Sequence, residues 1–498
     1  MLKRGFKKLI KLVELLHNVK TLEVSGNSSN VEIDSLTLNS RDVKPNSLFA
    51  AIKGFKTDGH NFILDAISKK ASAVLLEVSN DEIDSLLIKN NCIKITVENS
   101  RRTFAQLSCN FYDNPSKKLN VIGITGTKGK TTTAFCTKYL LESADQKTGL
   151  IGTIKNLTGD KELPSKLTTP EANEVNYLLN EMVSTGCSSI VTEVSSHSLY
   201  LDRVYGIDFD TAIFTNITSD HLDFHETFAN YFEAKKILFD SMKESGNVIY
   251  NIDDENGLKI VSDTKAKKHS YGFSNKANYR ISELDYDLSG TRFTLSLEGK
   301  SFAVSTKLIG KFTAYNITAS IIAACLSGVE LQDAIKAAET IPQIPGRFQV
   351  INKDSKNVII DYSHTADSLK QALESIIHLN KNNQPIYTVF GCGGDRDRTK
   401  RPIMGKIATE LSDKVIITSD NPRTENPLAI IEDIKEGLST DSFTVIESRE
   451  AAIKEAIENS EENAIILIAG KGHEEYQEIH GVRNHFSDKE TTERYLKL

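Results

Sequence analysis

The chain has 498 residues, too many for a single hydrophobic core, and this length predicts about three domains. Its 60 Lys and Arg against 67 Asp and Glu give a net charge of −7. These charges are spread along the chain rather than gathered in a basic stripe, which argues against a nucleic-acid-binding protein. The six cysteines form no C-x-x-C pair, so neither a zinc site nor a redox motif is indicated, and a reducing compartment fits best.

The amino-terminal segment Met1–His17 is basic and amphipathic, and it is predicted to form a first helix. Lys8 and Lys11 interrupt its apolar residues, whereas a signal peptide needs a continuous apolar stretch. No apolar run reaches the roughly 18 residues of a membrane span. We therefore expect a cytoplasmic, monomeric protein without nucleic-acid or membrane partners.

Residues 1–115 are predicted to form a small first α/β domain, with strands at Leu48–Ile52 and Ala73–Leu76 and a helix at Asp65–Lys70. Short apolar runs bounded by polar residues are typical of such buried strands. The polar stretch Tyr112–Lys118 contains a proline, and it is predicted to link this domain to the next one.

Residues 116–342 are predicted to form a central domain in which strands alternate with helices. Such alternation predicts a mainly parallel sheet with helices on both faces. Residues 280–308 alternate apolar and polar side chains, which predicts an antiparallel hairpin appended to this sheet. The other predicted strands and helices of the domain are Ser189–Val194, Thr211–Thr215, Asn247–Asn251, Ala134–Leu141 and Ala314–Ser327.

Residues 343–498 are predicted to form a third, Rossmann-like domain that lacks a dinucleotide fingerprint. The segment Ile341–Arg347 carries two prolines and a glycine, so it marks a breakpoint and is predicted to be a hinge. Beyond it another α/β pattern begins. Its predicted strands are Val358–Tyr362, Ile386–Phe390, Lys414–Thr418 and Ala464–Ala469.

The segment Gly123–Thr132, GITGTKGKTT, is the most informative stretch of the chain. It lies between the apolar run Leu119–Ile122 and the predicted helix, and this strand–glycine loop–helix order is typical of a triphosphate-binding P-loop. In that arrangement Lys130 reaches the β- and γ-phosphates and the Thr131 hydroxyl binds Mg²⁺. The alternative is an ordinary glycine turn between a strand and a helix.

Ionisable residues follow two strands of the central domain. Glu193 lies at the end of its strand, where α/β folds place ligands, and beside a P-loop its carboxylate can hold Mg²⁺. A polar cluster after the next strand contains Asp220, His221, Asp223 and His225. The two groups suggest a shared metal site, although a strand-end Glu paired with a lysine and a solvated loop remain alternatives. By itself, Lys235 on a predicted helix is most simply a surface lysine.

Three polar loops follow strands of the third domain, at Phe390–Asp397, Asp420–Arg423 and Ala469–Glu474. Arg396 can offer a guanidinium fork to a phosphate or carboxylate. Arg423 follows a proline, and a stiff turn of this kind suits bidentate recognition of a carboxylate. Any one loop can be an ordinary turn, but the three together favour one ligand site at the sheet edge.

With these residues in view, the chain resembles the Mur ligase family from end to end, and within it the MurE type. The motifs that carry the resemblance are Thr125–Thr132, Thr168–Pro170, Glu193–His197, Asp220–Asp223, Ala234–Lys235, Gly391–Arg396, Asp420–Arg423 and Gly470–Glu474. In the first domain, the segments that look like the family's uridine-nucleotide pocket are Leu38–Arg41, Leu48–Gly54 and Asp58–His60.

The resemblance implies an ATP-dependent, ADP-forming ligase that adds meso-diaminopimelate to UDP-N-acetylmuramoyl-L-alanyl-D-glutamate through an acyl phosphate, in peptidoglycan synthesis. The ATP-binding residues that it implies are Gly126, Thr127, Lys128, Gly129, Lys130, Thr131, Thr132, Asn316 and Arg347. Those implied for the sugar nucleotide are Leu38, Ser40, Phe55, Lys56, Thr57, Thr168, Thr169, Ser195 and Arg203. Those implied for the amino acid are Arg396, Asp420, Asn421, Pro422, Arg423, Gly470 and Glu474.

The resemblance also implies a catalytic centre and its metal. Its implied catalytic residues are Lys130, Glu193, His221 and Lys235, and its implied Mg²⁺ ligands are Thr131, Glu193, His221 and Lys235. Family members carry a carbamylated lysine, N6-carboxylysine, at the position that matches Lys235, which replaces the surface-lysine interpretation. A carbamate forms only from a neutral amine, so burial is expected to lower the pKa of Lys235.

Several alternatives stay open at this point. Lysine or ornithine can replace diaminopimelate, although each would leave Arg423 without the distal carboxylate that it is expected to bind, just as Glu474 is expected to bind the distal ammonium. A folylpolyglutamate-synthase-like ligase shares the P-loop and the lysine but not the Asp-Asn-Pro-Arg turn. A P-loop kinase would leave the third domain without a role, and intact Lys130 argues against a non-catalytic nucleotide sensor.

Overall fold

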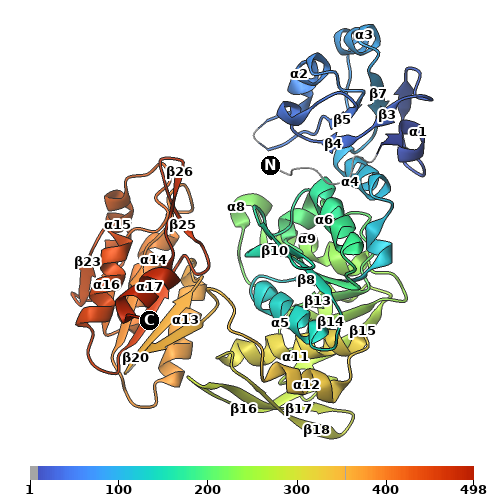
Figure 1. Cartoon of the computed structure of the whole chain (residues 1–498). Helices are drawn as coiled ribbons and strands as arrows, with labels where there is room; N and C mark the ends of the chain where they lie inside the picture. The colour runs from blue at the N-terminus through green and yellow to red at the C-terminus, as the bar shows by residue number, and fades with distance from the viewer. Residues whose placement is uncertain (1–8, 56, 354) are drawn as a thin grey trace. The chain divides into compact units, whose positions relative to one another are not determined.

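The computed structural model describes residues 9–55, 57–353 and 355–498, and the chain divides into two compact units. The first unit holds the residues up to Asn278 together with Ala319–Glu330, and the second holds Tyr279–Thr318 and Leu331–Leu498 (Figure 1). The predicted binding residue Lys56 and the first part of the predicted amino-terminal helix lie outside the described residues. Within the described ranges, no helix is long and apolar enough to cross a membrane.

A five-stranded sheet forms the first domain. Its order is β2-β7-β6-β5-β4, in which β4 to β7 run parallel and β2 pairs antiparallel with β7. The strands are β2 (Glu23–Ser25), β4 (Ser35–Thr37), β5 (Ser47–Ala50), β6 (Ala73–Leu76) and β7 (Ile93–Thr96). The helices are α2 (Ile63–Ser68), α3 (Asp81–Lys89) and α4 (Ser100–Phe111), and the predicted linker contains the 3-10 helix η3 (Pro115–Lys118).

The predicted helix at Met1–His17 is wrong over its described part. Only Leu12–Leu15 is helical (α1), and Ile10–Lys11 instead forms the short strand β1, paired with β3 (Glu32–Ile33). Leu12 and Leu15 are fully buried, and the Leu12 amide donates to the Val31 carbonyl over 2.8 Å. This pairing with a distant segment outweighs the local amphipathic pattern, because it gives the backbone partners outside a helix.

The central domain contains the long mixed sheet of the first unit, in the order β11-β10-β9-β12-β8-β13-β14-β15. The strands β9, β12, β8, β13, β14 and β15 run parallel, and β10 and β11 form an antiparallel edge. The strands are β8 (Asn120–Thr125), β9 (Thr148–Ile151), β10 (Lys155–Thr158), β11 (Lys161–Pro164), β12 (Ser189–Glu193), β13 (Thr211–Phe214), β14 (Asn247–Asn251) and β15 (Lys267–Gly272). The mainly parallel central sheet is therefore confirmed.

Helices pack on this sheet through apolar side chains. The helices α6 (Ala172–Ser184) and α9 (Phe228–Asp240) bury Leu178 and Leu238 in one cluster with Val121 of β8. The helix α5 (Lys130–Glu142) packs against β8, β9 and β12. The shorter helices are α7 (Ser196–Tyr200), α8 (Leu222–His225) and α10 (Gly257–Ile260), and α11 (Lys311–Leu326) continues from the second unit into the first. These contacts fix the carboxyl ends of β8 and β12 beside the start of α5.

The second unit begins with an antiparallel meander of β16 (Tyr279–Asp287), β17 (Gly290–Leu297) and β18 (Lys300–Thr306), followed by α12 (Leu331–Ala338). The hairpin predicted for residues 280–308 is confirmed and gains a third strand. The unit also holds a six-stranded sheet in the order β19-β20-β24-β21-β22-β23, parallel except for β19. Its strands are β19 (Gln349–Lys353), β20 (Lys356–Asp361), β21 (Ile386–Phe390), β22 (Lys414–Ile417), β23 (Phe443–Val445) and β24 (Ile465–Ala469).

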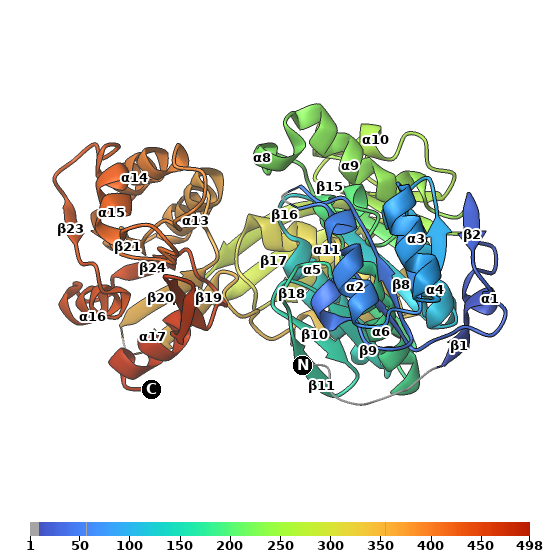
Figure 2. The ribbon, with the colours of Figure 1, turned by 90° about the horizontal axis from the view of Figure 1, so that it is seen from above.

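Helices cover both faces of the six-stranded sheet, as a Rossmann-like fold requires (Figure 2). One face carries α13 (Ala366–Leu379), α14 (Lys400–Leu411) and α15 (Pro427–Lys435), and the other carries α16 (Arg449–Asn459) and α17 (Asp488–Leu496). Arg449 and Asp488 form a fully buried ion pair, 2.7 Å from Nε to Oδ1, and Arg449 also donates to the Ala469 carbonyl. The ion pair thus joins α16 to α17, and the bond to Ala469 connects both helices to the carboxyl end of β24.

Candidate active site

The P-loop lies between β8 and α5. Gly126 has φ 150° and lies so close to the Thr215 side chain that a Cβ there would collide with it, so only glycine fits. Gly129, with φ 85°, precedes Lys130 at the start of α5. The Lys130 ammonium donates to the Gly126 carbonyl over 2.7 Å and to the Thr127 carbonyl over 3.0 Å. The loop thus joins a buried strand to the positive end of a helix, as anion binding requires.

Glu193 ends β12 and is 1% exposed. The Thr131 hydroxyl donates to its Oε2 over 2.9 Å, and the Thr153 amide donates to its Oε1 over 2.8 Å. The Thr153 hydroxyl bonds Oε2 as well, at 3.1 Å. A P-loop hydroxyl and a carboxylate held together are the hard oxygen ligands that Mg²⁺ prefers, so these residues fit the predicted metal. Groups of Thr131 and Thr153 thus hold both carboxylate oxygens of Glu193.

Lys235 lies on α9 and is 1% exposed, so it is not a surface lysine. Its ammonium donates to the Gly126 carbonyl over 2.9 Å, and its Nζ lies 4.6 Å from the centre of the Tyr231 ring. Burial, reinforced by the charge of Lys130, holds the pKa of Lys235 well below its usual value. Lys130 and Lys235 therefore converge on one carbonyl of the P-loop.

His221 and His225, from the polar cluster after β13, both lie beside the rings of His197 and Tyr231. His221 has φ 55° and precedes α8, and its ring centre lies 6.2 Å from that of Tyr231. Burial lowers the pKa of the His221 imidazole. His225 instead turns into the protein, where its Nε2 lies 3.0 Å from the Ser196 hydroxyl, and Asp223 is exposed. Among the described residues, no three His, Cys, Asp or Glu side chains are placed to share an ion, and the metal site shared with Glu193 stays a prediction.

Four residues predicted for the sugar nucleotide gather around the end of β12. The Thr169 hydroxyl donates to the Glu193 carbonyl over 2.8 Å and accepts from the Ser195 amide over 3.1 Å. The Thr168 hydroxyl lies 3.0 Å from that of Thr153. Arg203 donates to the Thr169 carbonyl over 3.3 Å and pairs with Glu171. Thr153 carries no motif in the sequence, so only the fold reveals that it joins the Glu193 centre to this group.

The predicted first-domain residues lie on loops of the same unit. Leu38 and Ser40 follow β4, and the Asn173 side chain of α6 donates to the Leu36 carbonyl of that strand over 3.1 Å. Phe55 is 69% exposed, and its ring centre lies 4.9 Å from that of Phe224, just after His221. The Thr57 carbonyl accepts from the Gly54 amide, which closes the turn before it. Phe55 is thus the residue that brings the first domain close to the His221 segment.

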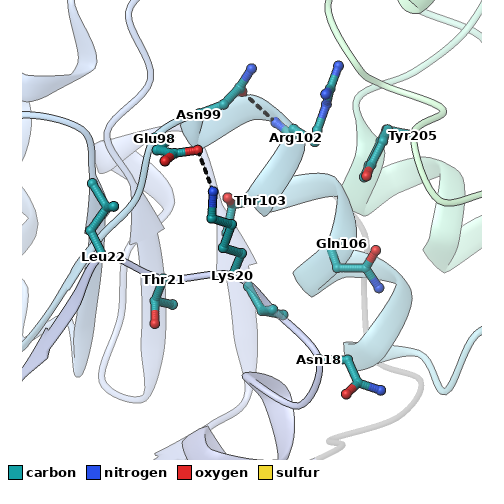
Figure 3. A pocket seen from close by; sticks show the side chains of 11 residues that line it. Asn18, Lys20, Thr21, Leu22, Glu98, Asn99, Arg102, Thr103, Gln106 and Tyr205 are labelled. Atoms are coloured by element: carbon teal, nitrogen blue, oxygen red, sulfur yellow. Dashed lines mark hydrogen bonds and ion pairs between the residues drawn. The ribbon is translucent and has the colours of Figure 1, made fainter.

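A surface cavity of the first unit has none of these residues in its lining. It is lined by the segment before β2, by α4 and by Tyr205 (Figure 3). Lys20 pairs with Glu98 across it at 2.9 Å, and Arg102 stacks 4.8 Å above the Tyr205 ring. Of the described residues that were predicted to bind a ligand, none lines this cavity. Lys20 and Glu98 neutralise each other and Arg102 pairs with Asp202 outside the lining, so the cavity is not assigned as the site.

The second unit brings the three predicted loops together, because β24, β21 and β22 are neighbours in its sheet. The Asn421 amide donates to Glu474 Oε2 over 2.8 Å, and Arg423 donates to the Gly394 carbonyl over 2.6 Å. Gly470 has φ 119°, and a Cβ on it would meet the Asp420 carboxylate. Asp420 to Arg423 thus lie between the other two loops, with Arg396 exposed at the rim. The three loops therefore contact one another, while their binding of one ligand stays a prediction.

Further residues of this site were not predicted. Arg423 contacts the hairpin of β25 (Tyr476–Ile479) and β26 (Val482–His485). Its backbone amide donates to the Glu478 carbonyl over 3.0 Å. Arg401 is fully buried and donates to the Gly393 carbonyl over 3.2 Å and to Glu425 over 2.8 Å. The hairpin strands have few apolar residues, so the hairpin has no clear signal in the sequence. The burial of Arg401 has no clear signal there either.

Asn316 and Arg347, the remaining residues predicted for ATP, belong to the second unit. The Arg347 guanidinium lies 4.8 Å above the ring of Tyr362, and Asn316 is a buried residue of α11. Their roles toward ATP stay predictions, as does the hinge at Ile341–Arg347.

Three family models match the chain: "Mur ligase family, catalytic domain" at residues 32–112, "Mur ligase middle domain" at 124–324 and "Mur ligase, glutamate ligase domain" at 346–472. The chain is 43% identical over 491 residues to UDP-N-acetylmuramoyl-L-alanyl-D-glutamate–2,6-diaminopimelate ligase 1 of Clostridium acetobutylicum, covering 98% of this chain and 99% of that one. It is 43% identical to the corresponding ligase of Clostridium botulinum over 483 residues, or 96% of this chain and 98% of that one.

Solved structures agree with these matches. A structure of a UDP-N-acetylmuramoyl-L-alanyl-D-glutamate–2,6-diaminopimelate ligase matches with a TM-score of 0.69 and 32% identity, over 98% of this chain and 99% of that one. A Mycobacterium tuberculosis folylpolyglutamate synthase shares only the fold, at 15% identity and a TM-score of 0.61 over 73% of this chain and 91% of that one. The three-domain α/β architecture and the full-length relatives show that this chain belongs to the Mur ligase family.

Proposed function

We propose that the chain is an ATP-dependent, ADP-forming ligase that joins meso-diaminopimelate to UDP-N-acetylmuramoyl-L-alanyl-D-glutamate in peptidoglycan precursor synthesis. The observation that carries the proposal is the 43% identity, over nearly the whole of both chains, to a relative named for this reaction. Both ATP and the nucleotide sugar are cytoplasmic metabolites, so a cytoplasmic location is part of the proposal. The proposal also includes three domains, with the limits 1–115, 116–342 and 343–498.

The first step activates a carboxylate. A free carboxylate is a poor acyl donor, because oxide would have to leave. Transfer of the γ-phosphoryl group from ATP to the glutamyl carboxylate gives an acyl phosphate and ADP. Negative charge spreads over the transferring group, and Lys130 is proposed to offset it, a role that its position at the start of α5 supports. Thr168, Thr169, Ser195 and Arg203 surround the end of β12, where they support binding of the peptide part of the sugar nucleotide.

Thr131, Glu193, His221 and Lys235 are the residues that would hold Mg²⁺ in this proposal, the last as its carbamate. When bound, the ion neutralises phosphate oxygens and orients them. Lys235 contributes through its burial, since a lysine with a lowered pKa supplies the neutral amine that captures CO₂ and releases a proton. Glu193 keeps its orientation through the hydroxyls of Thr131 and Thr153.

The second step forms the amide. The α-amine of the amino acid attacks the acyl phosphate through a tetrahedral intermediate, phosphate leaves, and the amine loses a proton. In the second unit, Arg423 is proposed to bind the distal carboxylate of diaminopimelate, and Glu474 its distal ammonium. Arg423 is held by its amide, its carbonyl and its guanidinium, which reach Glu478, His480 and Gly394. A preorganised guanidinium of this kind favours a substrate with two carboxylates over lysine or ornithine.

Replacing Arg423 with alanine tests this assignment. We expect kcat/KM for diaminopimelate to fall about 100-fold, because its distal carboxylate loses a charged partner. The low rates with lysine and ornithine should stay within about threefold of the wild-type values, because neither places a carboxylate there. The measurement is phosphate release with saturating ATP and sugar nucleotide and varied amino acid. Arg494→Ala is the control, since Arg494 pairs with Glu450 on the surface of α17. A wild-type preference for lysine or ornithine would refute the choice of amino acid.

A further inference from the structure

Lys471 is a fully buried lysine in the loop that follows β24. Its ammonium donates to Asn421 Oδ1 over 3.0 Å and to Glu474 Oε2 over 3.4 Å, and it lies 5.4 Å from the centre of the Tyr476 ring. Lysine side chains are almost never fully buried unless they are paired. The partners of this one are two residues already predicted to bind the amino acid, so its charge is neutralised within the site itself.

These bonds determine how Asn421 is oriented. Its Oδ1 accepts from Lys471 and also from the Glu478 amide, at 2.9 Å. An amide oxygen that accepts two bonds leaves the NH₂ group to point the other way, and Nδ2 donates to Glu474 Oε2 over 2.8 Å. Lys471, Asn421 and Glu474 therefore form a closed triangle that joins the loops after β22 and β24.

The triangle also sets the direction of the Glu474 carboxylate. Within the described part of the chain, the hydrogen bonds that Glu474 accepts end on Oε2, from Asn421 and from Lys471. Its Oε1 is then the oxygen that can meet an incoming ammonium. Removing the cation would leave a largely buried carboxylate with one neutral partner, which favours rotation of its side chain toward water.

We propose that Lys471 is a positioning residue of the amino-acid site, which acts by holding Glu474 and Asn421 in the orientation that binds the distal ammonium. This inference rests on the proposed function, because Glu474 has that role only in a diamino-acid ligase. Lys471 itself does not touch the substrate in this account. It should therefore influence the amino acid alone, and neither ATP nor the sugar nucleotide.

The test is Lys471→Met in the full chain, with KM measured for each of the three substrates. We expect KM for diaminopimelate to rise about tenfold or more, as is usual when a group that orients a ligand-binding residue is removed. The KM values for ATP and sugar nucleotide should stay within about twofold, and kcat at saturating amino acid should change far less than KM. Lys414→Met is the matched control, because Lys414 lies at the opposite end of β22 from Asp420.

Variants of Glu474 and a second substitution of Lys471 test the same inference. Combining Lys471→Met with Glu474→Gln should raise KM little beyond the effect of Glu474→Gln alone, since the first change acts through Glu474. If Lys471→Met does not fold, Lys471→Gln replaces it, with the same rise in KM expected at smaller size. A wild-type KM for diaminopimelate in the folded variant, or full additivity with Glu474→Gln, overturns the inference. A wild-type chain that forms no amide with any diamino acid refutes instead the proposed function.

Discussion

Replacing Lys130 with alanine is expected to lower the rate of acyl-phosphate formation about 1,000-fold, because the P-loop then lacks the cation that offsets charge on the transferring phosphoryl group. The measurement is ADP release with all three substrates present. The fold should survive, since the Lys130 side chain donates to the Gly126 and Thr127 carbonyls of its own loop and is not among the buried residues of α5.

Lys138→Ala is the matched control for this change. Lys138 lies on the same helix, α5, about two turns further on, where it pairs with Glu142. Its removal should leave ADP release within about twofold of the wild type, because Lys138 pairs along its own helix, about two turns away from the P-loop. Unimpaired ADP release by Lys130→Ala would contradict the assignment of the P-loop.

Replacing Lys235 with methionine is the second change with a large expected effect. Methionine fills the buried site but cannot form a carbamate, and we expect kcat to fall at least about 100-fold. Protons compete with CO₂ for the amine, so added bicarbonate should raise the wild-type rate more at acidic than at alkaline pH. Burial lowers the pKa of Lys235, which increases the fraction of neutral amine at a given pH.

Isotope labelling checks the carbamate directly. With ¹³C-bicarbonate, the wild type should show a carbamate carbon signal that disappears in Lys235→Met. Lys236→Met is the control: Lys236 is the next residue of α9, but it pairs with Asp240 and Asp263 instead of the P-loop, and it should keep both signal and activity. A labelled carbamate that persists in Lys235→Met would place the modification elsewhere.

Local sequence determines much of the fold. The strands Ala73–Leu76, Asn247–Asn251 and Ile386–Phe390 were predicted with their observed bounds, because each is a short apolar run closed by polar residues. The hairpin β25–β26 was missed, since its side chains are mostly exposed and alternate weakly. Arg423 of a distant loop pairs with it through a bridge to Ile479. Such long-range pairing leaves no local pattern.

The candidate site likewise contains some residues that the sequence predicts and others that it does not. Lys130, Glu193 and Arg423 follow strands at positions where α/β folds place ligands, so the sequence predicted them. Thr153 and Lys471 were missed, because a threonine in a loop and a lysine between glycines have no distinct pattern before burial is known. The sequence places Asp223 and His225 in one polar cluster, whereas the structure leaves Asp223 exposed and buries His225, a difference that spacing alone does not reveal.

The stoichiometry of the complete reaction tests the central claim most directly, namely that ATP cleavage drives an amide bond between the sugar-nucleotide peptide and the amino acid. ATP, UDP-N-acetylmuramoyl-L-alanyl-D-glutamate and meso-diaminopimelate are mixed with the chain and Mg²⁺, and ADP, phosphate and amide product are counted. We predict one ADP and one phosphate for each amide formed, and no sustained turnover when either acceptor or amine is omitted. Full-rate phosphate release without the amino acid would contradict the account and indicate a kinase or ATPase instead.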